Sequence, residues 1–181
     1  MSKPTADVSV RVAWADDADA IADVQVRAWR DRYATLLPAE ALPSDPAEFA
    51  AQWHAALSRP GDARNRVLVA LVRNTVVGFA VTSPASDPDC DPVADGEMVE
   101  LVVAPDARGA GHGSRLLQAV ADTLVADRFS QAVTWAIAGD DTTRAFLTDA
   151  GWGSDGAHRA LDLDGSGATV VKQVRLHTAL T

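Results

Sequence analysis

The feature that most constrains the fold is a glycine-rich turn in the middle of the chain. Residues 96–104 are mostly apolar or β-branched, and Arg-Gly-Ala-Gly-His-Gly follows at 108–113, ahead of an amphipathic run. This order predicts a strand, a turn and the start of a helix. Glycines let a phosphate approach the backbone N–H groups, and a helix N-terminus adds unpaired donors and partial positive charge. The segment therefore fits a pyrophosphate-binding turn, or a tight strand-to-helix connection without a ligand.

The rest of the chain alternates between strand and helix patterns. Alternating valines predict a strand at 8–12, and an N-cap at Asp16 or Asp17 starts a helix that ends near Tyr33. The sequence Ser-Asp-Pro at 44–46 starts a second helix. Further elements are expected in this order: a hairpin (67–72 and 76–81), a loop (84–95), a strand (96–104), a helix (111–129), a strand (131–137), a helix (141–150) and a hairpin (158–163 and 170–180). The pattern predicts an α/β (α+β) fold with a mixed sheet covered by helices.

Length and charge limit the classes of function. The 181 residues suit a single domain over 1–181, with residues 1–7 as a tail that lacks signal-peptide features, so a cytoplasmic location is expected. No apolar run is long enough to span a bilayer, so no membrane partner is expected. The formal net charge of -9 disfavours nucleic acid and leaves an anionic cofactor dependent on local donors. The same surface would suit a cationic substrate.

Metal and disulfide chemistry have little support. Cys90 is the only cysteine, which excludes an intramolecular disulfide and a thiolate-rich metal site. His54, His158 and His177 lack metal-ligand spacing, so we expect no metal.

The glycine turn and its surroundings resemble a known family. Residues 108–113 match the signature of the GNAT acetyltransferase superfamily, which is Arg or Gln, two free positions, Gly, one free position, then Gly or Ala. Leu101, Val103 and Pro105 resemble that family's fourth strand, and Gly151-Trp152 resembles the end of its last helix. The chain thus resembles a GNAT N-acetyltransferase over most of its length.

The resemblance implies a fold and a cofactor. It implies a mixed, mostly antiparallel sheet of about seven strands with about four helices, whose bulged fourth strand splays from the fifth around a pantetheine arm. The cofactor would be acetyl-CoA or another acyl-CoA. By position, the expected cofactor-binding residues are Leu101, Val102 and Val103 along the arm, with Arg108, Gly109, Ala110, Gly111, His112, Gly113 and Ser114 around the pyrophosphate. A backbone N–H near Val102 or Val103 would stabilise the oxyanion, and the His112 side chain should point away from the phosphate.

The resemblance also implies an amine acceptor and a general base. Glu100 and Glu97 lie on the strand nearest the thioester and are the candidate bases, although either could be a structural strand residue. The family's usual acid, a tyrosine on the last helix, is replaced by Leu147, and Asp140 or Asp141 stands where the family often has asparagine. Tyr33, the only tyrosine, is a candidate substitute or a packing residue.

Two classes of function stay open. The first is an N-acyltransferase that acts on an amine of a small molecule, peptide or protein, and the second is a non-catalytic acyl-CoA-binding sensor module. An unrelated nucleotide-binding domain is disfavoured by the order of the strands. The acidic loop residues Asp87, Asp89, Asp91 and Asp95 are either solvated or suited to recognising a cationic amine. Homodimers are common among similar folds.

Overall fold

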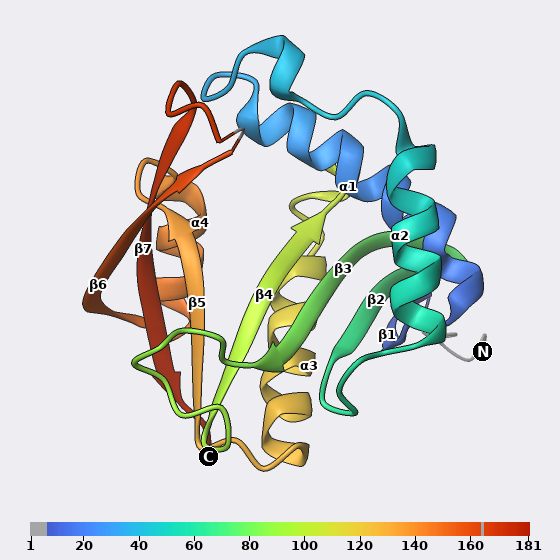
Figure 1. The fold of residues 1–181 in the computed structure, drawn as a ribbon. Helices are drawn as coiled ribbons and strands as arrows, with labels where there is room; N and C mark the ends of the chain where they lie inside the picture. Colours follow the sequence, from blue (N-terminus) through green and yellow to red (C-terminus); the bar gives the residue numbers. More distant parts are fainter. Residues whose placement is uncertain (1–6, 164) are drawn as a thin grey trace, which may run out of the picture.

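Seven strands form one sheet in the order β1-β2-β3-β4-β5-β7-β6 (Figure 1). The computed structural model describes residues 7–163 and 165–181, so residues 1–6 of the expected tail (1–7) and Asp164 lie outside the described residues. The strands are β1 Val8–Val12, β2 Arg66–Val72, β3 Thr75–Pro84, β4 Asp95–Val103, β5 Gln131–Ile137, β6 Gly153–Asp162 and β7 Val170–Ala179. Neighbouring strands pair antiparallel except for β4 and β5, which are parallel. The mixed, mostly antiparallel sheet confirms the expected fold class.

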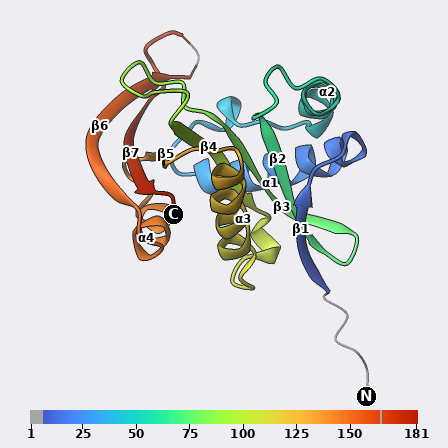
Figure 2. The same ribbon diagram turned by 90° about the horizontal axis from the view of Figure 1, so that it is seen from below.

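Within the described residues, four α-helices cover the two faces of the sheet (Figure 2). They are α1 Ala18–Tyr33, α2 Pro46–Ser58, α3 His112–Ala126 and α4 Asp141–Asp149. Leu116, Val120 and Leu124 of α3 enter one buried cluster with Leu147 of α4. The residues Ile21, Val24 and Ala28 of α1 form a second cluster with strand residues of the opposite face. No helix within the described ranges is long and apolar enough to cross a membrane.

The boundaries follow the sequence pattern closely, with three larger differences. The strand β3 runs on to Pro84, three residues past its expected end, where it still pairs with β4. The helix α3 ends at Ala126 rather than near 129, because Arg128 adopts a positive φ of 70° and turns the chain toward β5. The strand β6 starts at Gly153, five residues earlier than expected. A register shift between Ser154 and His158 and the exposure of this stretch remove the alternation that would have indicated a strand.

The two strands β4 and β5 pair only at their beginnings and then diverge (Figure 1). Their ladder consists of three residue pairs and stops at Glu97 and Val133. A register shift against β3 leaves Val99 as an extra residue in β4, which is the bulge that the resemblance implied. Close packing fixes β4 from its other side, because a Cβ on Gly78 would lie 2.7 Å from the carbonyl oxygen of Val102. The sheet is therefore open between the two strands.

Candidate functional site

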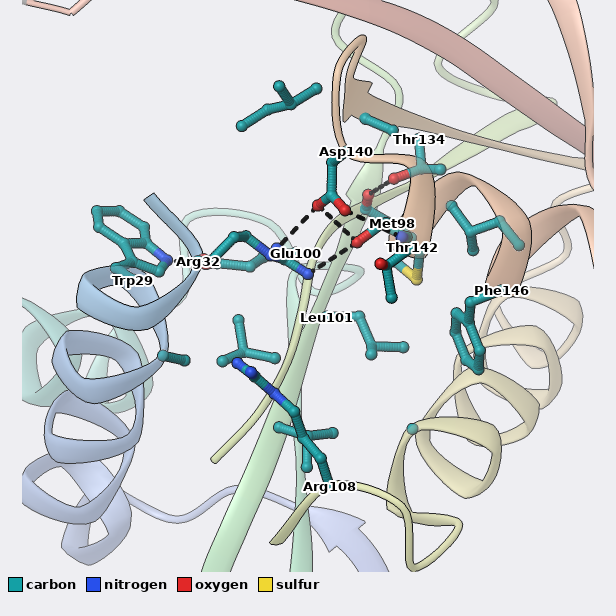
Figure 3. Close-up of a pocket in the computed structure, with 18 of the residues that line it drawn as sticks. Trp29, Arg32, Met98, Glu100, Leu101, Arg108, Thr134, Asp140, Thr142 and Phe146 are labelled. Atoms are coloured by element: carbon teal, nitrogen blue, oxygen red, sulfur yellow. Dashed lines mark hydrogen bonds and ion pairs between the residues drawn. The ribbon is translucent and has the colours of Figure 1, made fainter. Parts of the chain in front are cut away.

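A cavity of about 960 Å³ lies where β4 and β5 diverge (Figure 3). It extends from the end of α1 across β4 and β5 to the start of α3 and to α4. The expected site residues that line it are Tyr33, Glu100, Leu101, Val102, Val103, Arg108, Gly109, Gly111, His112, Gly113 and Ser114. Glu97 and Ala110 are not among the lining residues. One cavity thus joins the glycine turn to one of the two candidate bases.

The glycine turn adopts a conformation that few other residues could follow. Gly109 and Gly111 have φ values of 79° and 82°, and Gly111 is the N-cap of α3. Arg115 folds back over the turn and donates from Nη1 to the carbonyl oxygen of Ala110 at 3.0 Å. The first N–H groups of α3 begin directly after this turn, where an α-helix has unpaired donors and partial positive charge. This end of the cavity is built to receive an anion.

The side chains of His112 and Arg108 differ in what they offer at this end. The His112 ring is 4% exposed, and its buried Nδ1 has no hydrogen-bond partner among the described residues. Arg108 donates from Nη1 to the carboxylate of Asp31 on α1. The turn and the Arg108 guanidinium together fit a polyanion such as the pyrophosphate of an acyl-CoA, and the buried His112 Nδ1 agrees with the expectation that this side chain points away from the phosphate.

Glu100 lies beyond the last β4–β5 pair and faces the cavity from β4 (Figure 3). The indole N–H of Trp29 donates to its Oε1 at 2.6 Å, which links α1 to β4. Burial raises the pKa of the Glu100 carboxyl, while the Trp29 hydrogen bond and the positive charge of Arg32 lower it in part. The net effect is a carboxyl group whose pKa is higher than usual.

Glu97 has a different environment from that of Glu100. It lies where β4 and β5 still pair, opposite Val133, and is 6% exposed. Its carboxylate accepts hydrogen bonds from the Ser86 backbone N–H at 3.3 Å and from the Ser86 hydroxyl at 3.2 Å. The structure therefore separates the two candidates, because the cavity opens only after Glu97.

Tyr33 and Leu147 lie on opposite sides of the cavity. The Tyr33 ring packs edge-on against Trp29, with 6.1 Å between ring centroids. Burial raises the pKa of its phenol, and the nearby Arg32 guanidinium lowers it in part. Leu147 lines the cavity from α4 and is 2% exposed. The position matched to the family's tyrosine thus presents an apolar side chain to the cavity.

Arg32 is a site residue that the sequence analysis missed. Its guanidinium donates from Nη2 to the hydroxyl of Thr143 at 3.0 Å and places Nε 3.5 Å from the Asp140 carboxylate (Figure 3). These contacts span the cavity from α1 to the start of α4. Trp29, Arg32 and Tyr33 share one helix face by their spacing of three and four residues, a signal that could have grouped them beforehand.

The acidic loop at 84–95 is tied to the sheet by Arg175 of β7. Arg175 donates to both carboxylate oxygens of Asp89 at 2.7 Å and to Asp155 at 2.6 Å, and lies 3.6 Å from Asp87. Asp87, Asp89 and Cys90 place possible metal-ligand atoms close together, but both carboxylates already contact this guanidinium. None of the four loop acids named from the sequence lines the cavity. Their carboxylates stabilise the loop rather than face the cavity.

Comparison with known sequences identifies one family. The sequence profile described as the acetyltransferase (GNAT) family matches residues 23–152, which is more than two thirds of the chain. The match includes α1, β4, the glycine turn and α4, and so covers the cavity just described. No curated protein sequence matches the chain.

Solved structures share the fold at low sequence identity. A ribosomal-protein-alanine N-acetyltransferase from Brucella melitensis is 22% identical, with a TM-score of 0.72 over 95% of this chain and 99% of that one. The PaiA N-acetyltransferase from Thermoplasma acidophilum, solved with coenzyme A, is 14% identical, with a TM-score of 0.71 over 99% of both chains. The protein yncA from Salmonella typhimurium, solved with its cofactor acetyl-CoA, is 16% identical, with a TM-score of 0.69 over 97% and 95%. These similarities establish the fold.

Proposed function

Because the chain belongs to the GNAT acetyltransferase family, we propose that it transfers an acetyl or short acyl group from acyl-CoA to an amine of a small molecule or peptide. The observation that carries this proposal is the single cavity that joins the anion-binding turn to Glu100. A turn for pyrophosphate and a carboxylate for proton removal are the two parts that direct attack of an amine on a thioester requires.

The residues of this chain can hold acyl-CoA, as the Salmonella and Thermoplasma proteins hold acetyl-CoA and coenzyme A. When bound, acyl-CoA supplies an activated thioester carbonyl. The backbone N–H groups of 108–114 and the Arg108 guanidinium would bind its pyrophosphate. Leu101, Val102 and Val103 line the cavity along the edge of β4 that β5 leaves free, which suits the pantetheine arm. A backbone N–H of Val102 or Val103 is the proposed oxyanion donor.

Glu100 is the proposed general base. An alkyl amine has a pKa near about 10.4 and is mostly protonated at neutral pH, so it must lose a proton before it can attack. The raised pKa of Glu100 makes its carboxylate a stronger base than an exposed glutamate. Trp29 occupies Oε1, which leaves Oε2 to take the proton from the amine directly or through water. Glu97 is assigned a structural role, because Ser86 binds it away from the cavity.

Tyr33 is the proposed general acid. Its raised pKa keeps the phenol protonated at neutral pH, so that it can give a proton to the departing thiolate. A thiol with a pKa of about 8.5 is a tolerable leaving group, so this proton transfer speeds the reaction without being essential.

Leu147 favours a second candidate function. A buried leucine at the position of the family's acid suits a protein that binds acyl-CoA and reports its presence without turnover. Such a sensor would keep the anion-binding turn and would not need Glu100 to take up a proton.

Thiol release separates the two functions. Acetyl-CoA-dependent thiol production should be measured against amino acids, peptides, polyamines and aminoglycosides, with cofactor binding followed by calorimetry. Release with one class of acceptor establishes the transferase, and tight cofactor binding without release from any acceptor selects the sensor. Absence of acyl-CoA binding would contradict both functions.

A further inference from the structure

Arg32 is the second of two arginines among the described residues that line the cavity. The first, Arg108, lies at the glycine turn and is paired with Asp31. Arg32 projects from the last turn of α1 over the part of the cavity that contains Glu100 (Figure 3). The cavity therefore has two guanidinium groups near α1, Arg108 reaching from the glycine turn to Asp31 and Arg32 beside Glu100, and the proposed pyrophosphate contact uses only Arg108.

Arg32 is held loosely compared with other arginines of this protein. It donates one hydrogen bond of 3.0 Å to the Thr143 hydroxyl, approaches Asp140 at 3.5 Å, and lies near enough to the Tyr33 phenol and the Glu100 carboxyl to lower the pKa of each in part. By contrast, Arg11 donates to both carboxylate oxygens of Asp17, from Nη1 at 2.7 Å and from Nη2 at 3.0 Å. A guanidinium has five N–H donors in a planar fork that matches a carboxylate, and the contacts of Arg32 satisfy few of them. The guanidinium is therefore able to bind a ligand.

Asp140 does not depend on Arg32. Its Oδ1 accepts the backbone N–H of Thr143 at 3.0 Å and its Oδ2 accepts the Thr143 hydroxyl at 2.7 Å, which caps α4. If Arg32 turns toward a ligand, Asp140 keeps both bonds and stays at the positive end of the helix. The move would break the Thr143 hydrogen bond and a loose ion pair, so a bound carboxylate can compete for Arg32.

We propose that Arg32 binds a carboxylate of a reactant beside Glu100, and that the preferred acceptor is therefore an amino acid or a similar amino carboxylate. This inference rests on the proposed transferase function. Glu100 would take the proton from the amine while Arg32 pairs with the acid group of the same molecule, so that each charge of a zwitterion meets its opposite. In a chain with a net charge of -9, a carboxylate needs such a local cation to bind. A carboxylate at the end of the acyl group would present the same chemistry to Arg32.

The test compares reactants that differ only in a carboxylate. In the first arm, kcat/KM is measured with acetyl-CoA for an amino acid, its amide and the matching decarboxylated amine. The second arm uses one neutral amine with succinyl-CoA and butyryl-CoA. Each arm is run on the wild type, Arg32→Gln, Arg32→Lys and Arg30→Gln. Arg30 is exposed on the same helix and does not line the cavity, so its variant controls for the lost charge.

The informative quantity is the preference ratio between reactants with and without the carboxylate. Loss of the Arg32 charge also affects Glu100, but that effect is common to all reactants and leaves the ratio unchanged. We expect Arg32→Gln to lower the ratio about 10- to 100-fold, Arg32→Lys to restore part of it, and Arg30→Gln to leave it as in the wild type. A loss in the first arm supports the amino carboxylate acceptor. A loss confined to the second arm overturns that acceptor and places the carboxylate on the acyl group.

A ratio that Arg32→Gln leaves unchanged in both arms overturns the proposal. If no reactant releases thiol, the proposed function fails separately. Calorimetry of the same amino acid and of succinate against CoA-loaded wild type and Arg32→Gln then decides whether a carboxylate binds there. Equal binding, or none, to the two proteins would reject the subsite.

Discussion

At the scale of single residues, opposing effects act on the pKa of the Glu100 carboxyl. Burial raises its pKa, and the Trp29 N–H and the Arg32 charge lower it. Because the net pKa is raised above 4.5, the fold favours the protonated form. Its contribution to stability is therefore complete at low pH and is lost as the pH rises from 4.5 through the raised pKa. The raised pKa that makes the Glu100 carboxylate a stronger base therefore also lowers the stability of the fold at higher pH.

Replacing Trp29 by phenylalanine removes the hydrogen bond that favours the carboxylate. The pKa of Glu100 should rise further, so the acidic limb of the pH profile of kcat should move to higher pH, with a loss of about 10-fold in kcat below neutral pH. Trp53→Phe is the matched control, because the Trp53 N–H donates to Gln25 at 2.7 Å and Trp53 does not line the cavity. An acidic limb that does not move in Trp29→Phe would show that Trp29 contributes packing and does not affect the pKa of Glu100.

Glu100→Gln should remove the acidic limb of the pH profile and lower kcat by about 100-fold or more, while the affinity for acetyl-CoA is kept.

At the scale of elements, the turn before α3 depends on its backbone conformation. Gly111→Glu puts a side chain at φ 82°, against the Arg115 guanidinium, and adds negative charge where an anion should bind. We expect a loss of about 100-fold or more in acetyl-CoA affinity, measured by calorimetry, with an unchanged circular dichroism spectrum. Gly61→Glu is the control, because a Cβ at Gly61 meets no atom within 4 Å. Equal affinity of the two variants would rule out the turn as the pyrophosphate site.

The sequence predicted most elements because their patterns are local. Valine alternation in β1, the Asp45-Pro46 start of α2 and the glycines before α3 each identify an element from a few neighbouring residues. The choice between Glu97 and Glu100 was not local, since it depends on where β5 leaves β4. The Arg32–Asp140 contact joins residues more than 100 positions apart, and only the folded chain brings them together.

At the scale of the whole molecule, Arg175 joins the loop at 84–95 to β6 and β7. Arg175→Gln removes the guanidinium that contacts Asp87, Asp89 and Asp155, and leaves Asp87 only its longer approach of 3.9 Å to Arg159 as a charge contact. We expect the free energy of unfolding at pH 7 to fall by about 1–3 kcal/mol, measured by urea denaturation. Arg27→Gln also removes contacts with two carboxylates, but at the surface, and should cost less than about 1 kcal/mol.

The contacts of Arg175 also make the free energy of unfolding depend on pH. The Arg175 hydrogen bonds hold the pKa of Asp89 below its usual 3.8, so this stabilisation is present above pH 3.8 and is lost as the pH falls through the lowered pKa. The difference between the wild type and Arg175→Gln in urea midpoint should therefore be largest near neutral pH and shrink in stronger acid. A constant difference at every pH would contradict the assignment.

The short ladder between β4 and β5 also bears on how cooperatively the sheet opens. Within the sheet, three residue pairs connect the block β1–β4 to the block β5–β7, and the buried cluster beneath α3 holds the two blocks together on one face. Because backbone pairing is thinnest there, amides at this seam should open at lower free energy than those inside either block. A ligand that binds both walls of the cavity closes this seam from inside. Amides of β7, which is separated from β4 by β5, should then exchange more slowly, and the two blocks should unfold as one unit.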